Sequence, residues 1–208
     1  MEREGFSFTA LKLCGLIAVV YGIQVYTGFD PGFNASTSPF WKFFTSILGH
    51  AGLEHLLNNL FFLGLFGSVY ELLTDSRTFL WTFILTGLFA NIAAFIFYPD
   101  STIIGASGAA TGVLAALATY RPNQVGLALG VPLPMWAVLV IYMAINLAGL
   151  SAHNGIAYGA HLMGLLSGFL VGVYLRTKES EEGNNEENEL ERQNWRERIR
   201  SWEEKYMM

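Results

Sequence analysis

The sequence has 208 residues, of which 52% are hydrophobic and 14% charged, and its mean hydropathy is +0.38. Because an average soluble domain contains about 25% charged residues, this composition excludes an ordinary water-soluble enzyme and indicates one membrane domain with a polar appendage. The single cysteine, Cys14, excludes an internal disulfide.

Six apolar segments follow one another along the chain. A helix needs about 20 apolar residues to cross a hydrocarbon core of about 30 Å, and the predicted crossings run approximately over residues 10–28, 54–73, 78–97, 107–120, 132–150 and 158–175. Turn-forming pairs such as Pro31-Gly32 and Pro99-Asp100 separate them. The sequence therefore predicts an all-α, polytopic six-helix bundle. Its fourth helix is short and ends below the bilayer surface, inside protein or a water-filled cavity.

A change of composition after Lys178 predicts the one domain boundary. Residues 1–178 hold seven acidic and seven basic side chains, whereas residues 179–208 hold ten acidic and five basic ones, so the tail carries the whole net charge of −5. We expect 1–178 to form the membrane domain and 179–208 an acidic cytoplasmic tail that is partly disordered. Its apolar residues recur at helical spacing and predict a short amphipathic helix, on the bilayer or on a partner: Leu190, Trp195, Ile199, Trp202 and Tyr206.

The basic residues near the ends of the crossings predict the orientation. If the N-terminus is cytoplasmic, Lys42 falls outside and the remaining six fall inside: Arg3, Lys12, Arg77, Arg121, Arg176 and Lys178. This excess on one side predicts that both termini are cytoplasmic. The second, fourth and sixth helices then all begin at the outer face.

Four polar residues lie at a similar depth below that outer face. His55, Asn59, Ser107 and His161 fall within the first two turns of the second, fourth and sixth helices. Polar groups inside a membrane are costly and normally face a bundle interior or a water-filled cavity, so their convergence predicts a functional site. Taken singly, Ser107 would more often be a packing residue, and Asn59 is as typical of interhelical hydrogen bonding.

Small residues predict that the fourth and sixth helices approach each other closely. The sixth helix carries Gly164, Gly168 and Gly172 at four-residue spacing, and the fourth carries Gly108 and Gly112. Such faces let two backbones come together in lipid. A serine and a histidine on these helices could then reach hydrogen-bonding distance, about 3 Å.

These residue types in this arrangement favour nucleophilic catalysis. A serine hydroxyl needs a neighbouring base to remove its proton, and His161 is the candidate base for Ser107. The developing oxyanion needs hydrogen-bond donors, which the Asn59 amide, the His55 ring and the Ser107 backbone N–H could supply. Because no carboxylate lies at the right depth to orient His161, we predict a dyad and not a triad.

The sequence resembles the rhomboid intramembrane proteases over about residues 35 to 175. Four motifs occur in that family's order: Trp41-Lys42 in the first loop, His55-x-x-x-Asn59 with the upstream His50, Gly105-Ala106-Ser107-Gly108, and Ala160-His161-x-x-Gly164. Glu71 also resembles the acid that ends the family's second helix. The resemblance implies a six-helix core, a Ser–His dyad, cleavage of membrane-protein segments near the outer leaflet, and substrate entry past the fifth helix.

Two residues depart from the family's pattern. Lys42 replaces the usual arginine, so bidentate pairing with a carboxylate is lost there. Thr111 stands where an aromatic residue often packs against the catalytic histidine. Of the other polar residues, we expect Trp41 and His50 to stabilise the first loop, and Asn91 and Asn146 to make ordinary helix–helix hydrogen bonds.

We therefore predict an intramembrane serine endopeptidase in the plasma membrane of a prokaryote. Its partners would be the lipid bilayer and transmembrane protein substrates, with no nucleic acid, cofactor or metal. The first alternative is a catalytically inactive relative that binds membrane proteins with the same fold. The second is a metal-dependent membrane hydrolase or transporter, but His50 and His55 lie five residues apart, which does not match H-E-x-x-H spacing.

Overall fold

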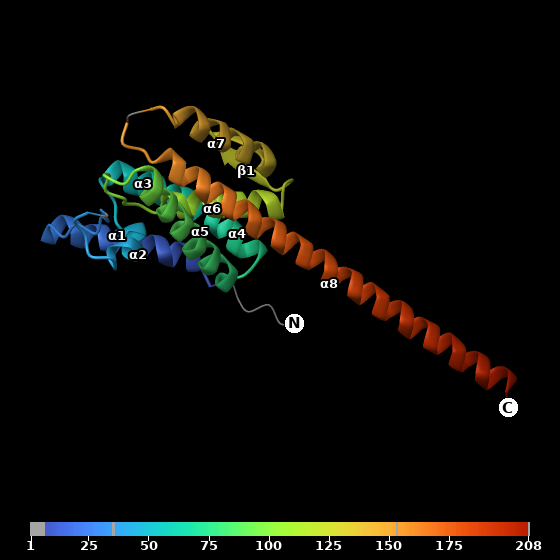
Figure 1. Cartoon of the computed structure of the whole chain (residues 1–208). Helices are drawn as coiled ribbons and strands as arrows, with labels where there is room; N and C mark the ends of the chain where they lie inside the picture. Colours follow the sequence, from blue (N-terminus) through green and yellow to red (C-terminus); the bar gives the residue numbers. More distant parts are fainter. Residues whose placement is uncertain (1–6, 35, 153, 208) are drawn as a thin grey trace. The chain divides into compact units, whose positions relative to one another are not determined.

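The computed structural model describes residues 7–34, 36–152 and 154–207 (Figure 1). Arg3, one of the residues that predict the orientation, lies outside these ranges. Contacts divide the chain into two compact units, of which the first ends at Gly172 and the second begins at Val173. The first unit contains the helices α1 Thr9–Thr27, α2 Lys42–Thr45, η1 Ser46–Leu48, α3 Leu53–Phe62, η2 Leu63–Gly67, α4 Ser68–Leu73, α5 Ser76–Phe97, α6 Ser107–Tyr120, α7 Met135–Gly149 and the beginning of α8, Tyr158–Tyr206.

Four helices in the described part of the chain are long and apolar enough to cross a membrane. They are α1, the continuous segment Leu53–Leu73 formed by α3, η2 and α4, then α5, and α8. The apolar helix α7 has 15 residues and α6 has 14, both fewer than the roughly 20 that a crossing needs. The structure is thus a mostly helical bundle consistent with a membrane protein, while the count of six crossings stays a prediction.

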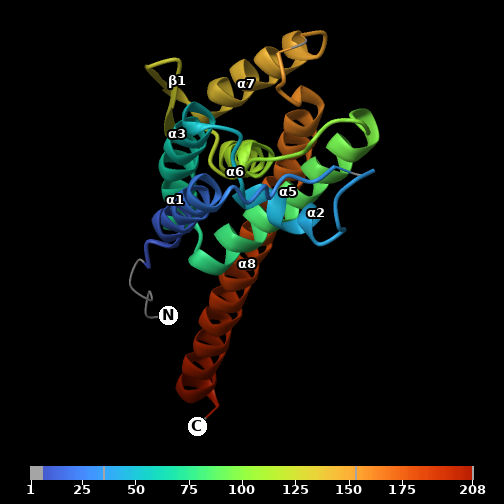
Figure 2. The ribbon, with the colours of Figure 1, turned by 90° about the vertical axis from the view of Figure 1, so that its left-hand side faces the viewer.

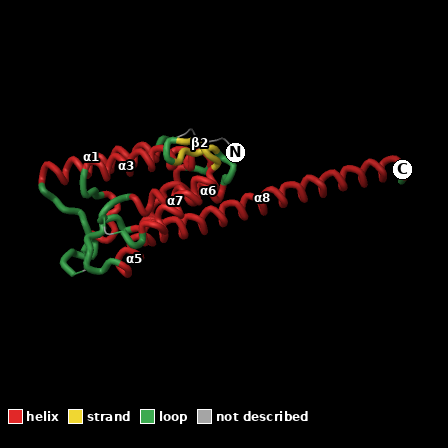
Figure 3. The backbone as a smooth tube through the Cα atoms, turned by 90° about the horizontal axis from the view of Figure 1, so that it is seen from above, coloured by secondary structure: helices red, strands yellow, loops and turns green. Residues whose placement is uncertain are grey.

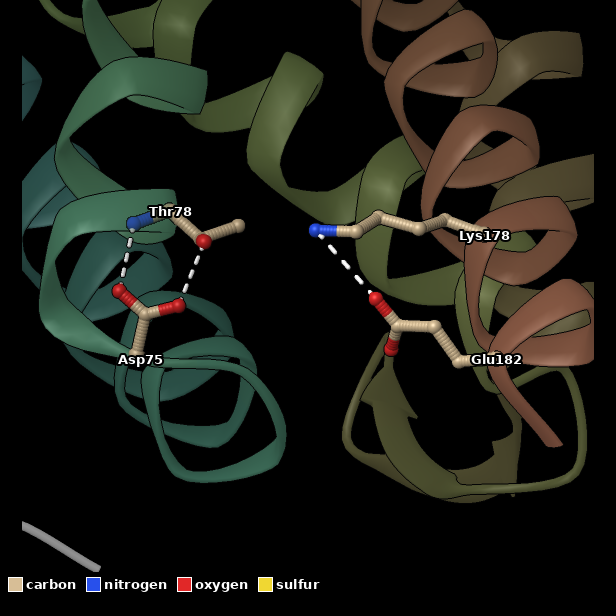
Figure 4. A network of polar contacts seen from close by, with 4 residues as sticks. All are labelled: Asp75, Thr78, Lys178 and Glu182. Carbon is tan, nitrogen blue, oxygen red and sulfur yellow. Dashed lines mark hydrogen bonds and ion pairs between the residues drawn. The ribbon is translucent and has the colours of Figure 1, made fainter. Parts of the chain in front are cut away.

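The ends of the long helices follow the turn chemistry of the sequence. Asp75 precedes α5, and its carboxylate accepts hydrogen bonds from the N–H and hydroxyl of Thr78 (Figure 4). It also accepts from the backbone N–H of Arg77. Partial burial works to raise the pKa of Asp75, but these hydrogen bonds outweigh it and hold the pKa below its usual value. The helix α1 ends at Gly28, whose φ of 71° is the left-handed conformation that glycine adopts without strain.

The short helix α6 lies at the centre of the first unit. Figure 2 looks nearly along its axis and shows α1, α3, α5 and α7 arranged around it. Every residue from 108 to 118 is buried, and the most extensive packing is against α5. Because protein surrounds α6, its ends need not reach the bilayer surface. A helix of only 14 residues can therefore lie inside the bundle.

Glycine and alanine let the neighbours of α6 approach it closely. A methyl group added at Gly164 or Gly168 of α8 would overlap the backbone carbonyl of Gly108 or Gly112. On the other side, a methyl group added at Gly108 would overlap Ala90 of α5. The small-residue faces predicted from the sequence therefore do form the contacts between these helices.

A β-hairpin was not expected in an all-α protein, and it corrects the predicted fold class in this detail. Strands β1 Val125–Ala128 and β2 Val131–Pro134 pair antiparallel between α6 and α7, with Val125 opposite Pro134 (Figure 3). The two turn residues, Leu129 and Gly130, both have positive φ, at 53° and 79°, as two-residue hairpin turns require. The predicted fifth helix therefore starts at Met135 instead of Pro132.

The second unit is helical in the range after Lys178 where the sequence predicts partial disorder. The helix α8 continues without a break to Tyr206, because glutamate, glutamine, lysine and arginine are good helix formers, and Lys178 forms an i,i+4 ion pair with Glu182 at 3.7 Å (Figure 4). Residues 176–205 are exposed throughout, including four of the predicted apolar positions, Leu190, Trp195, Ile199 and Trp202. The side chain of Tyr206 lies outside the described part.

Candidate active site

Ser107 is the first residue of α6 and is half-buried. The segment before it is extended and held by the first loop through backbone hydrogen bonds. Phe33 and Ile103 bond each other in both directions, at 2.9 and 2.8 Å, and the N–H of Gly105 donates to the carbonyl of Ser46 at 2.9 Å. The φ of Gly105 is 123°, which L side chains rarely adopt. The glycine of the G-x-S-G motif is therefore required by the backbone turn that leads into Ser107.

Asn91 of α5 fixes the part of the first loop that supports this turn. Its amide Nδ2 donates to the carbonyl of Phe43 at 2.7 Å and to the hydroxyl of Ser46 at 3.1 Å. Because Ser46 in turn accepts from Gly105, Asn91 supports the segment before Ser107 indirectly. The sequence predicts a helix–helix hydrogen bond from Asn91, and its partners lie on the short helices α2 and η1.

His161, in the first turn of α8, lies against Ser107. Its Nε2 is 2.8 Å from the Ser107 Oγ, within the range for an O–H···N hydrogen bond and for proton transfer. The glycine contacts described above bring the two helices together at this point. In addition, the hydroxyl of Thr111 donates to the carbonyls of Gly108 at 2.9 Å and His161 at 3.3 Å.

The second ring nitrogen of His161 has a partner that the sequence did not identify. Its Nδ1 is 2.9 Å from the Oδ1 of Asn146 on α7. The ring of Tyr158 also lies edge-on to the His161 ring, with centroids 6.2 Å apart. An asparagine within an apolar segment was the available signal for Asn146, but the sequence does not specify which neighbouring helix its side chain faces.

The two other predicted site residues lie on α3. The ring of His55 is half-buried and packs against Gly105, where an added Cβ would overlap the ring. Asn59 is buried, and its Nδ2 donates to the backbone carbonyl of His55 at 2.8 Å. An asparagine amide has two N–H donors, so one donor of Asn59 remains for a ligand. The structure thus places His55 beside the turn before Ser107 and leaves the oxyanion role of Asn59 a prediction.

His50 lies in the loop before α3 and is buried, with 2% of its surface exposed. The side chain of Gln24 fixes its backbone, donating to its carbonyl at 3.1 Å and accepting from its N–H at 3.0 Å. The rings of His50 and His55 are 5.0 Å apart. Burial is the main cause that lowers the pKa of His50 to about 4, and repulsion from His55 lowers it further. The backbone of Leu48 acts in the opposite direction and raises the pKa. His50 is therefore uncharged at neutral pH.

The residues of the first loop that resemble the family's Trp-Arg pair make local contacts. Trp41 stacks on Phe29, with ring centroids 6.4 Å apart. The Nζ of Lys42 donates to the backbone carbonyl of Asp30 and lies 5.8 Å from the centroid of the Phe29 ring. Lys42 thus connects two parts of the loop, and no carboxylate partner for it lies among the residues that the structure describes.

In the described residues, no group of three or more histidine, cysteine, aspartate or glutamate side chains could hold a metal ion. An apolar groove does lie between the first loop and α5, and it contains none of the four predicted site residues. Its lining is Phe33, Ser38, Phe40, Phe43, Phe44, Leu88, Ile92 and Phe95. The chemistry available at Ser107 therefore depends on hydroxyl, imidazole and amide groups.

Comparison with known proteins identifies the family to which the chain is similar. The family model of the Rhomboid domain matches residues 37–178. The rhomboid protein YdcA of Bacillus subtilis is 29% identical over 161 residues, which cover 74% of this chain and 75% of that protein. The rhomboid protease GluP of Bacillus subtilis is 30% identical over 135 residues, covering 65% of this chain but only 26% of GluP. The chloroplastic Rhomboid-like protein 11 of Arabidopsis thaliana is 38% identical over 81 residues, which cover 37% of this chain and 28% of that protein.

Proposed function

Because the chain belongs to the rhomboid family, we propose that it is an intramembrane serine endopeptidase that uses Ser107 and His161 as a catalytic dyad. Relatives whose names identify them as rhomboid proteases support the general activity. The observation that carries the specific proposal is the 2.8 Å distance between the Ser107 Oγ and the His161 Nε2. A serine that only filled a helix contact would have no need of an imidazole at that distance.

The proposed reaction begins with the transfer of the Ser107 proton to the Nε2 of His161. The Oγ attacks the carbonyl carbon of the scissile peptide bond, and His161 then gives the proton to the leaving amine. A water molecule, activated by His161 in the same way, hydrolyses the acyl-enzyme and restores the Ser107 hydroxyl. No carboxylate takes part in these steps.

Three donors are proposed for the oxyanion. The backbone N–H of Ser107 lies in the first turn of α6, where N–H groups have no partner within their own helix. The ring of His55 packs beside the turn that precedes Ser107, and Asn59 retains one amide N–H. Removal of one oxyanion donor typically costs about 3 kcal/mol of transition-state stabilisation. Asn59→Ala should therefore weaken cleavage by less than the loss of either dyad residue.

The proposed substrates are transmembrane segments of membrane proteins, cleaved near the outer leaflet. A continuous helix hides its carbonyl groups in internal hydrogen bonds, so cleavable segments should be poor helix formers. We further propose that the chain crosses a prokaryotic plasma membrane six times, with both termini in the cytoplasm. The membrane domain would end near Lys178. Substrate entry past α7 is an expectation from the family.

A serine-directed fluorophosphonate probe tests the proposed dyad in the full-length protein in detergent. The wild type should be labelled, and Ser107→Ala and His161→Ala should each lose labelling together with cleavage of a transmembrane substrate. Ser101→Ala is the matched control, because Ser101 is exposed and lies in the turn after α5. It should keep wild-type labelling.

The other outcomes identify the alternatives. An unlabelled wild type that still captures transmembrane segments would indicate a binding protein without catalysis. Cleavage that survives Ser107→Ala and is lost with a chelator would indicate metal chemistry. Near wild-type cleavage by His161→Ala would contradict the dyad.

A further inference from the structure

Asn146 is a buried polar residue of α7 with two hydrogen bonds, one within its own helix and one to α8. Only 4% of its surface is exposed. Its Nδ2 donates to the carbonyl of Tyr142, one turn earlier in the same helix, at 2.7 Å. Its Oδ1 lies 2.9 Å from the Nδ1 of His161 on α8. The side chain therefore joins the backbone of one helix to the imidazole of another.

The bond to Tyr142 determines which way the Asn146 amide points. A backbone carbonyl only accepts hydrogen bonds, and an amide nitrogen only donates them. The nitrogen must therefore face Tyr142, and the oxygen must face His161. Because that oxygen only accepts, the Nδ1 of His161 must carry the proton that lies between them.

A proton on Nδ1 leaves the other nitrogen of His161 free to act as a base. In a neutral imidazole only one ring nitrogen carries hydrogen, so the Nε2, which faces Ser107 at 2.8 Å, holds a lone pair. The Ser107 hydroxyl is then the donor in that hydrogen bond. This is the protonation state in which His161 can remove the Ser107 proton.

Two further side-chain contacts lie at His161 in the described part of the chain. The hydroxyl of Thr111, at the position where the resembling family often has an aromatic residue, reaches the backbone carbonyl of His161 and not its ring. Tyr158 meets the ring edge-on, with a centroid distance of 6.2 Å. That contact limits the position of the ring but does not specify which nitrogen is protonated.

We propose that Asn146 is a positioning residue, which holds His161 in the tautomer protonated at Nδ1 so that its Nε2 faces Ser107 as the base. The proposal rests on the dyad proposed above and extends it to a Ser107–His161–Asn146 arrangement on three helices. Asn146 touches no reacting atom. Its oxygen also accepts from Nδ1 when His161 becomes positively charged during the reaction, without placing a second charge in the membrane.

The first measurement is the tautomer of His161 by nitrogen-15 NMR of histidine-labelled full-length protein in detergent. The His161→Ala variant identifies the His161 signals by their loss. The wild type should show a protonated Nδ1 and an unprotonated Nε2. A wild-type His161 protonated at Nε2 would overturn the proposal, whatever any variant does.

The second measurement is the rate of fluorophosphonate labelling and of substrate cleavage in Asn146→Leu, which removes both polar groups at similar volume. We expect kcat to fall roughly 10- to 100-fold, as for other residues that orient a functional histidine through its second nitrogen. KM should change little, and the Nδ1-protonated signal should weaken. Leu147→Ala, at an exposed neighbour on α7, should behave as the wild type.

Asn146→Asp distinguishes positioning from packing, because it keeps an oxygen facing His161 and loses the donor to Tyr142. It should retain more activity than Asn146→Leu and preserve the Nδ1-protonated signal. If Asn146→Leu does not fold, the aspartate variant and the wild-type tautomer still decide the question. Unchanged kcat in a folded Asn146→Leu would overturn the role of Asn146 while leaving the dyad intact, whereas labelling that persists in Ser107→Ala would overturn the dyad itself.

Discussion

His50 shows how a histidine outside the proposed dyad can link stability to pH. It is buried beside His55 in the loop before α3, and its pKa is lowered to about 4 from a usual value of 6.5. At a pH between these two values, His50 is therefore mostly protonated in the unfolded chain and mostly neutral in the folded chain. Between these two pKa values the unfolded state holds more protons, so the stabilising contribution of the neutral ring is present above pH 6.5 and is lost as the pH falls toward 4.

We predict that lowering the pH from 7 to 5 destabilises the protein through His50 by at most about 2 kcal/mol, reduced by any solvent screening of the ring. Thermal unfolding in detergent at both pH values measures the change. In His50→Asn the fall between the two pH values should be shallower than in the wild type, even if the variant is less stable at pH 7. An identical fall would contradict the assignment to His50.

Individual residues differed in how far the sequence could identify their contacts. Ser107 and His161 were predictable because each lies at the start of a predicted crossing and within a recognisable motif, and the structure places their polar atoms in contact. The contact of Asn146 with His161 was not predictable, because an asparagine in an apolar helix indicates only that its side chain needs a hydrogen-bonding partner. That partner depends on the rotation of α7 about its own axis, which the packing of the whole bundle determines. Asn91 illustrates the same limit, since the sequence does not show that its partners lie on α2 and η1.

The contact between α6 and α8 depends on the absence of side chains. A methyl group at Gly168 would overlap the carbonyl of Gly112. We predict that Gly168→Ala pushes the two helices apart, lowers thermal stability in detergent, and reduces fluorophosphonate labelling by about tenfold or more, because small displacements of a reacting pair are costly. Gly183→Ala is the matched control, since an added methyl group there meets nothing within 4 Å. Equal labelling by both variants would show that the close approach is unnecessary.

Glu71 joins the end of α4 to the start of α1. Its buried carboxylate accepts from the backbone N–H groups of Thr9 and Ala10, both at 2.9 Å, and from the hydroxyl of Ser76 at 2.7 Å. Because Glu71→Gln replaces one accepting oxygen with a donor, at least one buried N–H loses its partner. We predict a loss of about 1–3 kcal/mol in the free energy of unfolding, measured by thermal or denaturant unfolding in detergent.

The control for this change is Glu54→Gln, because Glu54 is exposed in the first turn of α3. The interaction of Glu54 with the helix dipole is worth about 0.3–1 kcal/mol. Glu54→Gln should therefore lower the free energy of unfolding by less than Glu71→Gln does. Equal effects of the two substitutions would mean that the hydrogen bonds of Glu71 do not stabilise α1.

The elements themselves were predictable where periodicity and length agreed. The apolar runs gave boundaries close to those of α1, α5 and α6. The hairpin was missed because Pro132 to Pro134 was assigned to the following helix, although Leu129 and Gly130 form a two-residue turn. The continuation of α8 was not predicted because residues 180–189 are rich in glutamate and asparagine, a composition typical of disordered or solvated segments. Helix-forming residues on both sides, and the Lys178–Glu182 pair, instead favour one continuous helix.

The exposed part of α8 is expected to be dispensable for the proposed chemistry. Residues 176–205 are exposed, and the contacts that bring Ser107 and His161 together lie before Val173. We predict that a chain ending at Lys178 is labelled by fluorophosphonate within about twofold of the wild-type rate, because changes at exposed positions have small effects. A loss of labelling in a truncated protein that remains folded would show that the tail contributes to the site.

The arrangement of the chain across the membrane is the part of the proposal that charge alone supports. With both termini on the cytoplasmic side, Ser36 lies outside and Ser180 inside, and both are exposed in the structure. In a background carrying Cys14→Ala, we predict that Ser36→Cys reacts with a membrane-impermeant maleimide in intact cells and that Ser180→Cys reacts only after permeabilisation. The physical reason is the excess of basic residues on one side of the predicted crossings, which normally faces the cytoplasm. The reverse pattern would place Ser107 and His161 near the inner leaflet, and cleavage would then be expected on the cytoplasmic side of a substrate.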